Sequence, residues 1–172
     1  AAIVLNEVCA SGAGLNGASA VHISMFGINP VIKHGGEAMC RKYIPKVVSG
    51  ELNVCFGVTE PDAGTDTTRI TTRAVRKGDH YVINGRKTWM TKASESQKVL
   101  LLTRTTPLAE CKRRTDGMTL FLADLDPAHV TIKPIRKLGR HAVSSNDVFI
   151  DDLVVPVEDR VGEEGQGFKY LL

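Results

Sequence analysis

The stretch YVINGRKTWMT, residues 81–91, carries the clearest indication of fold class in this sequence. In it, Asn84-Gly85 separates the apolar run Tyr81–Ile83 from a second run, Arg86–Thr91. Asn-Gly between two such runs is a strong short-range signal for a β-hairpin, because a type I′ turn needs two residues that accept positive φ. We therefore expect two short antiparallel strands that are joined at Asn84-Gly85.

Short runs of the same kind lie on both sides of this hairpin, each bounded by turn residues. Arg69–Arg76 precedes it across the turn sequence Lys77-Gly78-Asp79-His80, and the apolar run Val54–Val58 lies further upstream. Further strands are expected at Lys98–Thr103, Met118–Ala123, Val130–Pro134 and Asp147–Ile150. At least six short strands with mostly local connections predict an antiparallel β-barrel or β-sandwich.

Before Gly50 the chain has helical periodicity instead, in Ala1–Met25 and Glu37–Val48. Gly35-Gly36 is a suitable stop between two helices, since glycine accepts the left-handed cap conformation. Pro45 is expected to kink the second helix or end it early, because proline lacks a backbone donor. We therefore expect an α+β fold, with N-terminal helices, an antiparallel β-domain and the first turn of a truncated C-terminal helix at Phe168–Leu172.

The composition is that of an ordinary soluble globular protein, since 42% of the 172 residues are hydrophobic and 24% are charged. The formal net charge of +3 is small, so neither nucleic acid nor a membrane surface is an expected partner. No apolar run is long enough to span a bilayer, and no signal peptide is visible. The four cysteines and five histidines lack zinc-site spacing, so no metal is expected and a reducing environment is favoured.

One glycine motif imitates a cofactor site. Gly12-Ala13-Gly14-Leu15-Asn16-Gly17 fits the G-x-G-x-x-G spacing of a dinucleotide-binding turn. That fingerprint needs a strand that runs into the first glycine and an acidic residue at the end of a second strand. Leu5–Ser11 has no strand character, and His34–Glu37 is helical or turn. These glycines are therefore expected to break a helix and to allow close helix packing.

The stretch TEPDAGTD, residues 59–66, follows the apolar run Val54–Val58 with small polar groups. Pro61 fixes one dihedral and Gly64 permits a reversal, so Thr59, Thr65 and several backbone N–H groups can converge on a small volume. Such a volume suits a polyoxygenated ligand. The alternative is a surface loop whose side chains bond their own backbone, and this stretch alone does not separate the two.

The only tryptophan, Trp89, lies two positions before Thr91. On a strand, side chains two apart share a face, so Trp89 and Thr91 would present an apolar slab beside a hydroxyl. That pair can cover a flat heteroaromatic ring and bond a nitrogen at its edge. A tryptophan in the core is the alternative.

Taken together, CFGVTEPDAGTD (55–66) and INGRKTWMT (83–91) resemble the paired flavin-binding signatures of the acyl-CoA dehydrogenase family. The usual forms are T-E-P-x-A-G-S-D and N-G-x-K-x-W-I-T. The resemblance implies FAD as cofactor and the α,β-dehydrogenation of a fatty acyl-CoA thioester, with hydride transfer to flavin N5. It also implies the end of an N-terminal helical domain (1–51), a middle β-domain that binds flavin and acyl-CoA (52–161) and the start of a C-terminal helical domain (162–172).

The resemblance assigns roles to individual residues. Thr59 is expected to donate to the pyrimidine edge of the flavin, Thr91 to lie near N5, and Thr65 to touch both the cofactor and the CoA thioester chain. Thr65 stands where serine is usual, and Lys92-Ala93 stands where asparagine and glycine are common. The full set of expected cofactor contacts is Phe56, Gly57, Val58, Thr59, Gly64, Thr65, Trp89, Met90 and Thr91.

No catalytic residue is expected within the chain, because the family's glutamate base would lie beyond Leu172. Glu163 and Glu164 are not expected to replace it. The resemblance therefore predicts an incomplete and inactive fragment of an enzyme whose electrons pass to an electron-transfer flavoprotein and which is a homo-oligomer at full length. An acyl-CoA oxidase and a non-catalytic flavin-binding scaffold remain the alternatives. Mitochondrial matrix and bacterial cytoplasm fit equally well.

Overall fold

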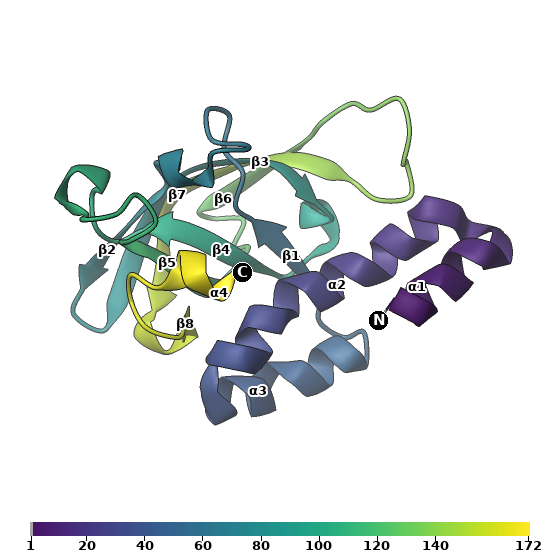
Figure 1. Ribbon diagram of the computed structural model, residues 1–172, viewed down its shortest axis with the longest axis horizontal. Helices are drawn as coiled ribbons and strands as arrows, with labels where there is room; N and C mark the ends of the chain where they lie inside the picture. The colour runs from purple at the N-terminus through teal and green to yellow at the C-terminus, as the bar shows by residue number, and fades with distance from the viewer. Residues whose placement is uncertain (1) are drawn as a thin grey trace.

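The computed structural model describes residues 2–172. Figure 1 shows three helices gathered on one side of a strongly bent β-sheet, with a short fourth helix near the C-terminus packed against it. The helices are α1 (Ala2–Val8), α2 (Gly14–His34), α3 (Gly36–Val48) and α4 (Gly167–Tyr170). The strands are β1 (Val54–Gly57), β2 (Arg73–Lys77), β3 (His80–Thr91), β4 (Lys98–Arg104), β5 (Met118–Asp124), β6 (Val130–Pro134), β7 (Ser145–Pro156) and β8 (Arg160–Val161).

The glycines of the imitation dinucleotide motif break the first helix. A π-helical turn, Cys9–Ala13, connects α1 to α2; Gly12 within it and Gly14 directly after it have φ values of 95° and 54°. The chain then turns back, so that α1 lies along the first turns of α2 (Figure 1). A Cβ at Gly17 would lie 2.5 Å from Cβ of Ala13 and 3.0 Å from Cγ1 of Val8. The expected helix break and close packing are confirmed.

The boundary between the two long helices also lies where the sequence predicts it. Helix α2 ends at His34, and Gly36 opens α3 with a φ of 76°. The expectation that Pro45 could end α3 early is wrong, because α3 continues to Val48. Met39 and Tyr43, each 5% exposed, pack this helix against the sheet, and such tertiary packing outweighs the loss of one backbone hydrogen bond.

The sheet has the order β6-β7-β3-β2-β4-β5-β8, and β1 joins it beside β4. All pairings are antiparallel except β1 with β4 and the single contact of β2 with β4. The bend brings the two halves of the sheet face to face, so that the rings of Tyr81 on β3 and Phe121 on β5 lie 4.7 Å apart, edge to face. The predicted helices and antiparallel β-domain are confirmed, and the sheet is open rather than closed into a barrel.

Strands β4 and β5 are buried on both faces. One face packs in the core between the sheet halves, where Val99, Leu101 and Phe121 lie. The other face, with Leu100 and Leu102, packs under α2 and α3. This double burial explains why the run Val99–Leu102 is continuously apolar rather than alternating. Strand β1, paired with β4, also contacts α2.

The predicted turn at Asn84-Gly85 is wrong. Strand β3 continues through both residues, and its pairing with β7 shifts by one position between Ile83 and Gly85, which is a β-bulge. The side chain of Asn84 is tied to β7 by two hydrogen bonds of 2.9 Å to Asp152. Gly85 has a φ of 155°, and a Cβ there would lie 2.7 Å from Cα of Thr72. Glycine is needed at this point for close approach of two chain segments, and the chain reverses instead at Gly78, in the turn predicted at 77–80.

Candidate functional site

The two segments that carry the sequence signatures lie side by side. The backbone N–H of Thr88 donates to the carbonyl oxygen of Thr59 at 2.9 Å. One residue earlier on β3, Nζ of Lys87 donates to the carbonyl oxygen of Val58 at 3.0 Å. These bonds hold the end of β1 and the loop that follows it against β3, so the loop at 59–66 lies next to Trp89.

A buried ion pair fixes the same junction. Nζ of Lys87 lies 2.8 Å from Oε1 of Glu60, and the two side chains are 0% and 5% exposed. Glu60 also accepts hydrogen bonds from the backbone N–H groups of Thr71 and Thr72 and from the hydroxyl of Thr71, at 2.7 to 3.0 Å. Both carboxylate oxygens are therefore satisfied, as a buried charge requires.

The protonation states follow from these contacts. Burial alone would raise the pKa of Glu60, but the attraction of Lys87 and hydrogen bonds from Lys87, Thr72 and Thr71 together lower it to about 2. Burial lowers the pKa of Lys87 to about 8, against the attraction of Glu60. The lowered pKa of Glu60 keeps its carboxylate ionised above about pH 2, whereas the lowered pKa of Lys87 lets its ammonium lose a proton above about pH 8. Because Glu60 accepts four donors, we take the ionised pair as the state at neutral pH.

Hydrogen bonds made by Glu60, Ala63 and Asp66 determine the conformation of the loop at 59–66. Glu60 and Ala63 exchange two backbone hydrogen bonds of 3.1 Å, and Asp66 accepts from the backbone N–H of Thr68 at 3.2 Å. The alternative of a loop that bonds its own backbone thus holds for Asp66. In contrast, the hydroxyls of Thr59 and Thr65 have no hydrogen-bond partner within residues 2–172. Those two hydroxyls remain available to a ligand.

Trp89 is not a core residue, since 62% of it is exposed. Regular alternation along β3 is interrupted just before it, where the pairing with β7 shifts between Lys87 and Met90. Trp89 itself has a φ of 58°, the left-handed conformation that bulky residues seldom adopt. Met90 is 1% exposed and points into the core, while Trp89 and Thr91 on either side of it stay outside. Both side chains thus lie outside the core, and a bulge rather than regular strand alternation puts them there.

Three of the remaining predicted residues, Phe56, Gly57 and Gly64, lie on β1 and in the loop that follows it. Phe56 packs edge to face against Phe26 of α2, with ring centroids 4.9 Å apart. A Cβ at Gly57 would lie 3.1 Å from the side chains of Val99 and Leu101, so Gly57 lets β1 sit closely on the sheet. Gly64 has open space around it. Cys55 precedes Phe56, and burial raises its pKa to about 12, so this thiol is no nucleophile.

A second group of polar contacts holds the backbone of Met90, the residue that follows Trp89, against β7. Asn146 on β7 is 0% exposed, and its Nδ2 donates to the carbonyl oxygen of Met90 at 2.9 Å and to Oγ of Ser144 at 2.9 Å. Its Oδ1 accepts from Oγ of Ser94 at 2.7 Å. Sequence reasoning missed Asn146, Glu60 and Lys87. The separation of Asn146 from Met90 by 56 positions leaves no local pattern that could reveal their contact.

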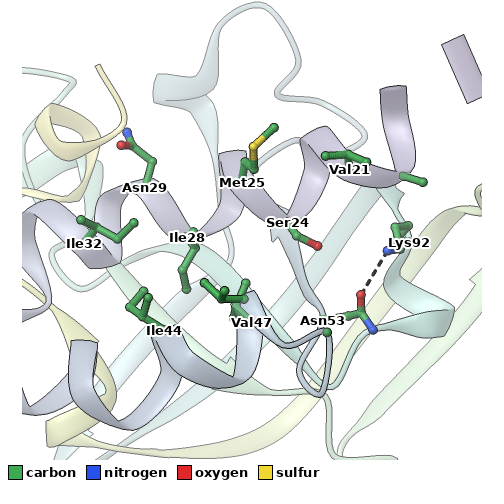
Figure 2. A pocket seen from close by; sticks show the side chains of 13 residues that line it. Val21, Ser24, Met25, Ile28, Asn29, Ile32, Ile44, Val47, Asn53 and Lys92 are labelled. Carbon is green, nitrogen blue, oxygen red and sulfur yellow. Dashed lines mark hydrogen bonds between the residues drawn. The ribbon is translucent and has the colours of Figure 1, made fainter. Parts of the chain in front are cut away.

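A cavity of about 460 Å³ opens between α2 and α3. Figure 2 shows its apolar wall of α2 and α3 side chains, with Lys92 and Asn53 at one end, where Nζ of Lys92 donates to Oδ1 of Asn53 at 3.1 Å. None of the nine predicted cofactor contacts lines this cavity. The predicted contacts therefore lie outside this cavity, and Lys92, which follows Thr91 in the sequence, is the lining residue next to them in the chain.

Neither a metal-ligand cluster nor a membrane-spanning helix occurs within residues 2–172. No three histidine, cysteine or acidic side chains there are grouped so that they could share a metal ion. No helix in the same range combines the length and the apolar character that crossing a bilayer requires.

Comparison with known proteins gives consistent matches. The sequence profile described as "Acyl-CoA dehydrogenase, middle domain" matches residues 55–153, and that described as "Acyl-CoA dehydrogenase, N-terminal domain" matches residues 1–51. Cyclohex-1-ene-1-carbonyl-CoA dehydrogenase of Syntrophus aciditrophicus is 37% identical over 176 residues, which cover 99% of this chain and 40% of that protein. A subunit of the caffeyl-CoA reductase-Etf complex of Acetobacterium woodii is 33% identical over 140 residues, which cover 81% of this chain and 36% of that protein.

Solved structures agree with the sequence matches. Butyryl-CoA dehydrogenase from Megasphaera elsdenii superimposes with a TM-score of 0.83 at 29% identity, over 90% of this chain and 40% of that one. The chain spans 36% to 40% of the length of these relatives.

Proposed function

Because the chain belongs to the acyl-CoA dehydrogenase family, we propose that its two joined segments hold FAD for the α,β-dehydrogenation of an acyl-CoA thioester. The observation that carries the proposal is the backbone hydrogen bond from Thr88 to Thr59, which joins the two signature segments directly before the exposed Trp89. The segments 1–51, 52–161 and 162–172 are proposed as parts of the three domains of such an enzyme.

The residues present fit a flat, polar-edged cofactor. The 62% exposed indole of Trp89 offers an apolar surface for one face of a ring system. The hydroxyls of Thr59, Thr65 and Thr91 can each donate one hydrogen bond at the edge of that ring or to the chain attached to it. Gly64 has open space around it, so the loop backbone can be approached closely.

Each residue then has a defined task. When bound, FAD supplies the redox chemistry by accepting hydride from the substrate. Thr91 would donate to N5 of the ring, and Thr59 would donate to the pyrimidine edge, where negative charge grows on reduction. Thr65 would bond both the cofactor and the thioester chain. The protein groups thus orient the cofactor and stabilise charge rather than react themselves.

We propose that the general base of the reaction lies outside residues 2–172. Glu60 is held by Lys87, Glu95 accepts a hydrogen bond from Ser144 at 2.7 Å, and Glu164 is bonded to Tyr81 and lies 3.7 Å from Arg160. These carboxylates are engaged in structure and are not free to take an α-proton. We propose that the base comes from another part of the enzyme, so the chain alone is inactive, because such a base contributes roughly 10² to 10⁴ in rate.

An electron-transfer flavoprotein is the proposed electron acceptor, since one relative is itself a subunit of an Etf complex. Reduction of such a flavoprotein, compared with oxygen consumption, would separate this acceptor from an oxidase reaction in the full-length protein. An oxidase would consume oxygen and leave the flavoprotein oxidised.

Binding of FAD by the purified chain tests the proposal directly. Trp89 is the only tryptophan, so quenching of its fluorescence on titration with FAD reports contact at the proposed site. We expect saturable quenching by FAD, and no turnover of butyryl-CoA or octanoyl-CoA with a dye acceptor. Absence of quenching would contradict the cofactor assignment, and turnover by the chain alone would contradict the missing base.

A further inference from the structure

Trp89 holds a conformation that its own environment does not favour. Its φ of 58° lies in the left-handed region, where the Cβ of a bulky residue crowds the backbone. With 62% of the residue exposed, burial of the indole offers little compensation. Such strain persists only where surrounding contacts enforce it, and it is concentrated at functional sites. The contacts that enforce it are therefore of functional interest.

The residues before Trp89 are held by buried bonds to the loop at 59–66. Lys87 places its ammonium between Glu60, at 2.8 Å, and the carbonyl of Val58, at 3.0 Å. Thr88 adds its backbone bond to Thr59. Because Lys87 is 0% exposed, water cannot replace the hydrogen bonds that its ammonium makes to Glu60 and Val58. These bonds therefore tie the backbone at 87–88 to the position of the loop.

The residue after Trp89 is held from the opposite strand. Nδ2 of Asn146 donates to the carbonyl oxygen of Met90, and Oδ1 of Asn146 is occupied by Ser94. Asn146 is 0% exposed and its side chain makes three hydrogen bonds, so it has little freedom to turn away. The peptide groups 87–88 and 90–91, which lie one residue away from Trp89 on either side, are thus fixed independently.

We propose that Lys87 and Asn146 are positioning residues, which clamp the bulge at Lys87–Met90 from both ends and thereby keep Trp89 and Thr91 turned out of the core for the cofactor. Neither side chain is accessible to a ligand, so each acts through the backbone of its neighbours. The cofactor part of this inference rests on the proposed function. The clamp itself concerns the protein alone and can be measured without FAD.

Three substitutions separate positioning from general stability. Lys87→Met removes the ammonium, and Asn146→Ala removes the amide. Lys98→Met is the matched control, because Lys98 is another buried lysine, 6% exposed, whose partners are Asp124 at 2.9 Å and Asp159 at 3.8 Å rather than the loop at 59–66. Steady-state fluorescence anisotropy reports the mobility of the single tryptophan in the chain without cofactor, and far-UV circular dichroism shows whether each variant is folded.

For Lys87→Met and Asn146→Ala we expect a clear fall in the anisotropy of Trp89 with a folded circular dichroism spectrum, and a loss of FAD affinity of about tenfold. For Lys98→Met we expect neither change. Unchanged anisotropy in a folded Lys87→Met or Asn146→Ala variant would overturn the role of that residue. If the unsubstituted chain binds no FAD, the proposed function fails, while the anisotropy comparison still decides the inference.

Amide hydrogen exchange tests the inference on the unsubstituted chain, so the test does not depend on whether any variant folds. The clamp predicts slow exchange at the amide of Thr88, which bonds Thr59 next to the bulge. Exchange of that amide at the rate of an unstructured peptide would overturn the inference.

Discussion

The ammonium of Lys87 lies 2.8 Å from a carboxylate oxygen of Glu60, although 27 positions separate the two residues. Each belongs to a different signature segment, and each is nearly or fully buried. Removing either partner would leave the other charge buried without compensation, which typically costs 3 to 5 kcal/mol. The pair therefore fixes the register between the loop at 59–66 and β3, on which the proposed site depends.

The Glu60 carboxylate should make the protein sensitive to acid. Its pKa of about 2 in the folded chain lies below its ordinary value of 4.5, so the unfolded chain binds more protons between these two pH values. The contribution is complete above about pH 4.5 and is lost as pH falls toward 2, with a size of about 3 kcal/mol. Urea unfolding measured across this window should show that loss.

Glu60→Gln should lack that part of the pH dependence. Glu51→Gln is its control, since Glu51 forms an exposed ion pair with Lys46 and should change stability little. Equal pH profiles for the unsubstituted chain and the Glu60→Gln variant would contradict the assigned protonation state.

Gly85→Ala should destabilise the protein by about 3 kcal/mol, because a Cβ would collide with Thr72 and the backbone is in a region that favours glycine. Gly78→Ala shares the positive φ, at 65°, but has no atom within 4 Å of the added Cβ. It should cost only about 1 kcal/mol. Thermal or urea unfolding of both variants measures the difference, and equal costs would show that close approach to Thr72 is unimportant.

Lys92 also has a left-handed backbone, with a φ of 62°. Asparagine accepts this conformation better than alanine, and neither can replace the bond from Nζ to Asn53. Lys92→Asn should therefore be more stable than Lys92→Ala by roughly 0.5 to 1 kcal/mol. Equilibrium unfolding of the two variants checks this, and a more stable alanine variant would rule out backbone strain at this position.

Thr91→Val keeps the size and the strand preference of the side chain and removes its hydroxyl. If Thr91 donates to the flavin, affinity for FAD should fall by on the order of 1 kcal/mol, close to tenfold. The titration by Trp89 fluorescence measures this loss. Thr105→Val is a useful control, because the hydroxyl of Thr105 lies 2.8 Å from that of Thr119, away from the proposed site. Unchanged affinity in Thr91→Val would remove Thr91 from the site.

Local features of the sequence determined a large part of this fold. The helical periodicity before Gly50, the turn at 77–80 and most strand positions all depend on residues within a few positions of one another. The helix break at Gly12 and Gly14 is of the same kind, because glycine's freedom at positive φ belongs to the residue itself. The paired signatures also identified the family, since they are short and contiguous.

The tertiary structure alone decided the details of the site. Asn84-Gly85 has the local preference of a turn, but pairing with β7 and the approach of Thr72 make it a bulge within one long strand. The exposure and strain of Trp89, its support by Asn146 and the ion pair of Lys87 with Glu60 all arise between residues that are distant in sequence. Backbone preferences act over a few residues, whereas burial and hydrogen-bond partners depend on which distant segments the fold brings together, and only the folded chain contains that information.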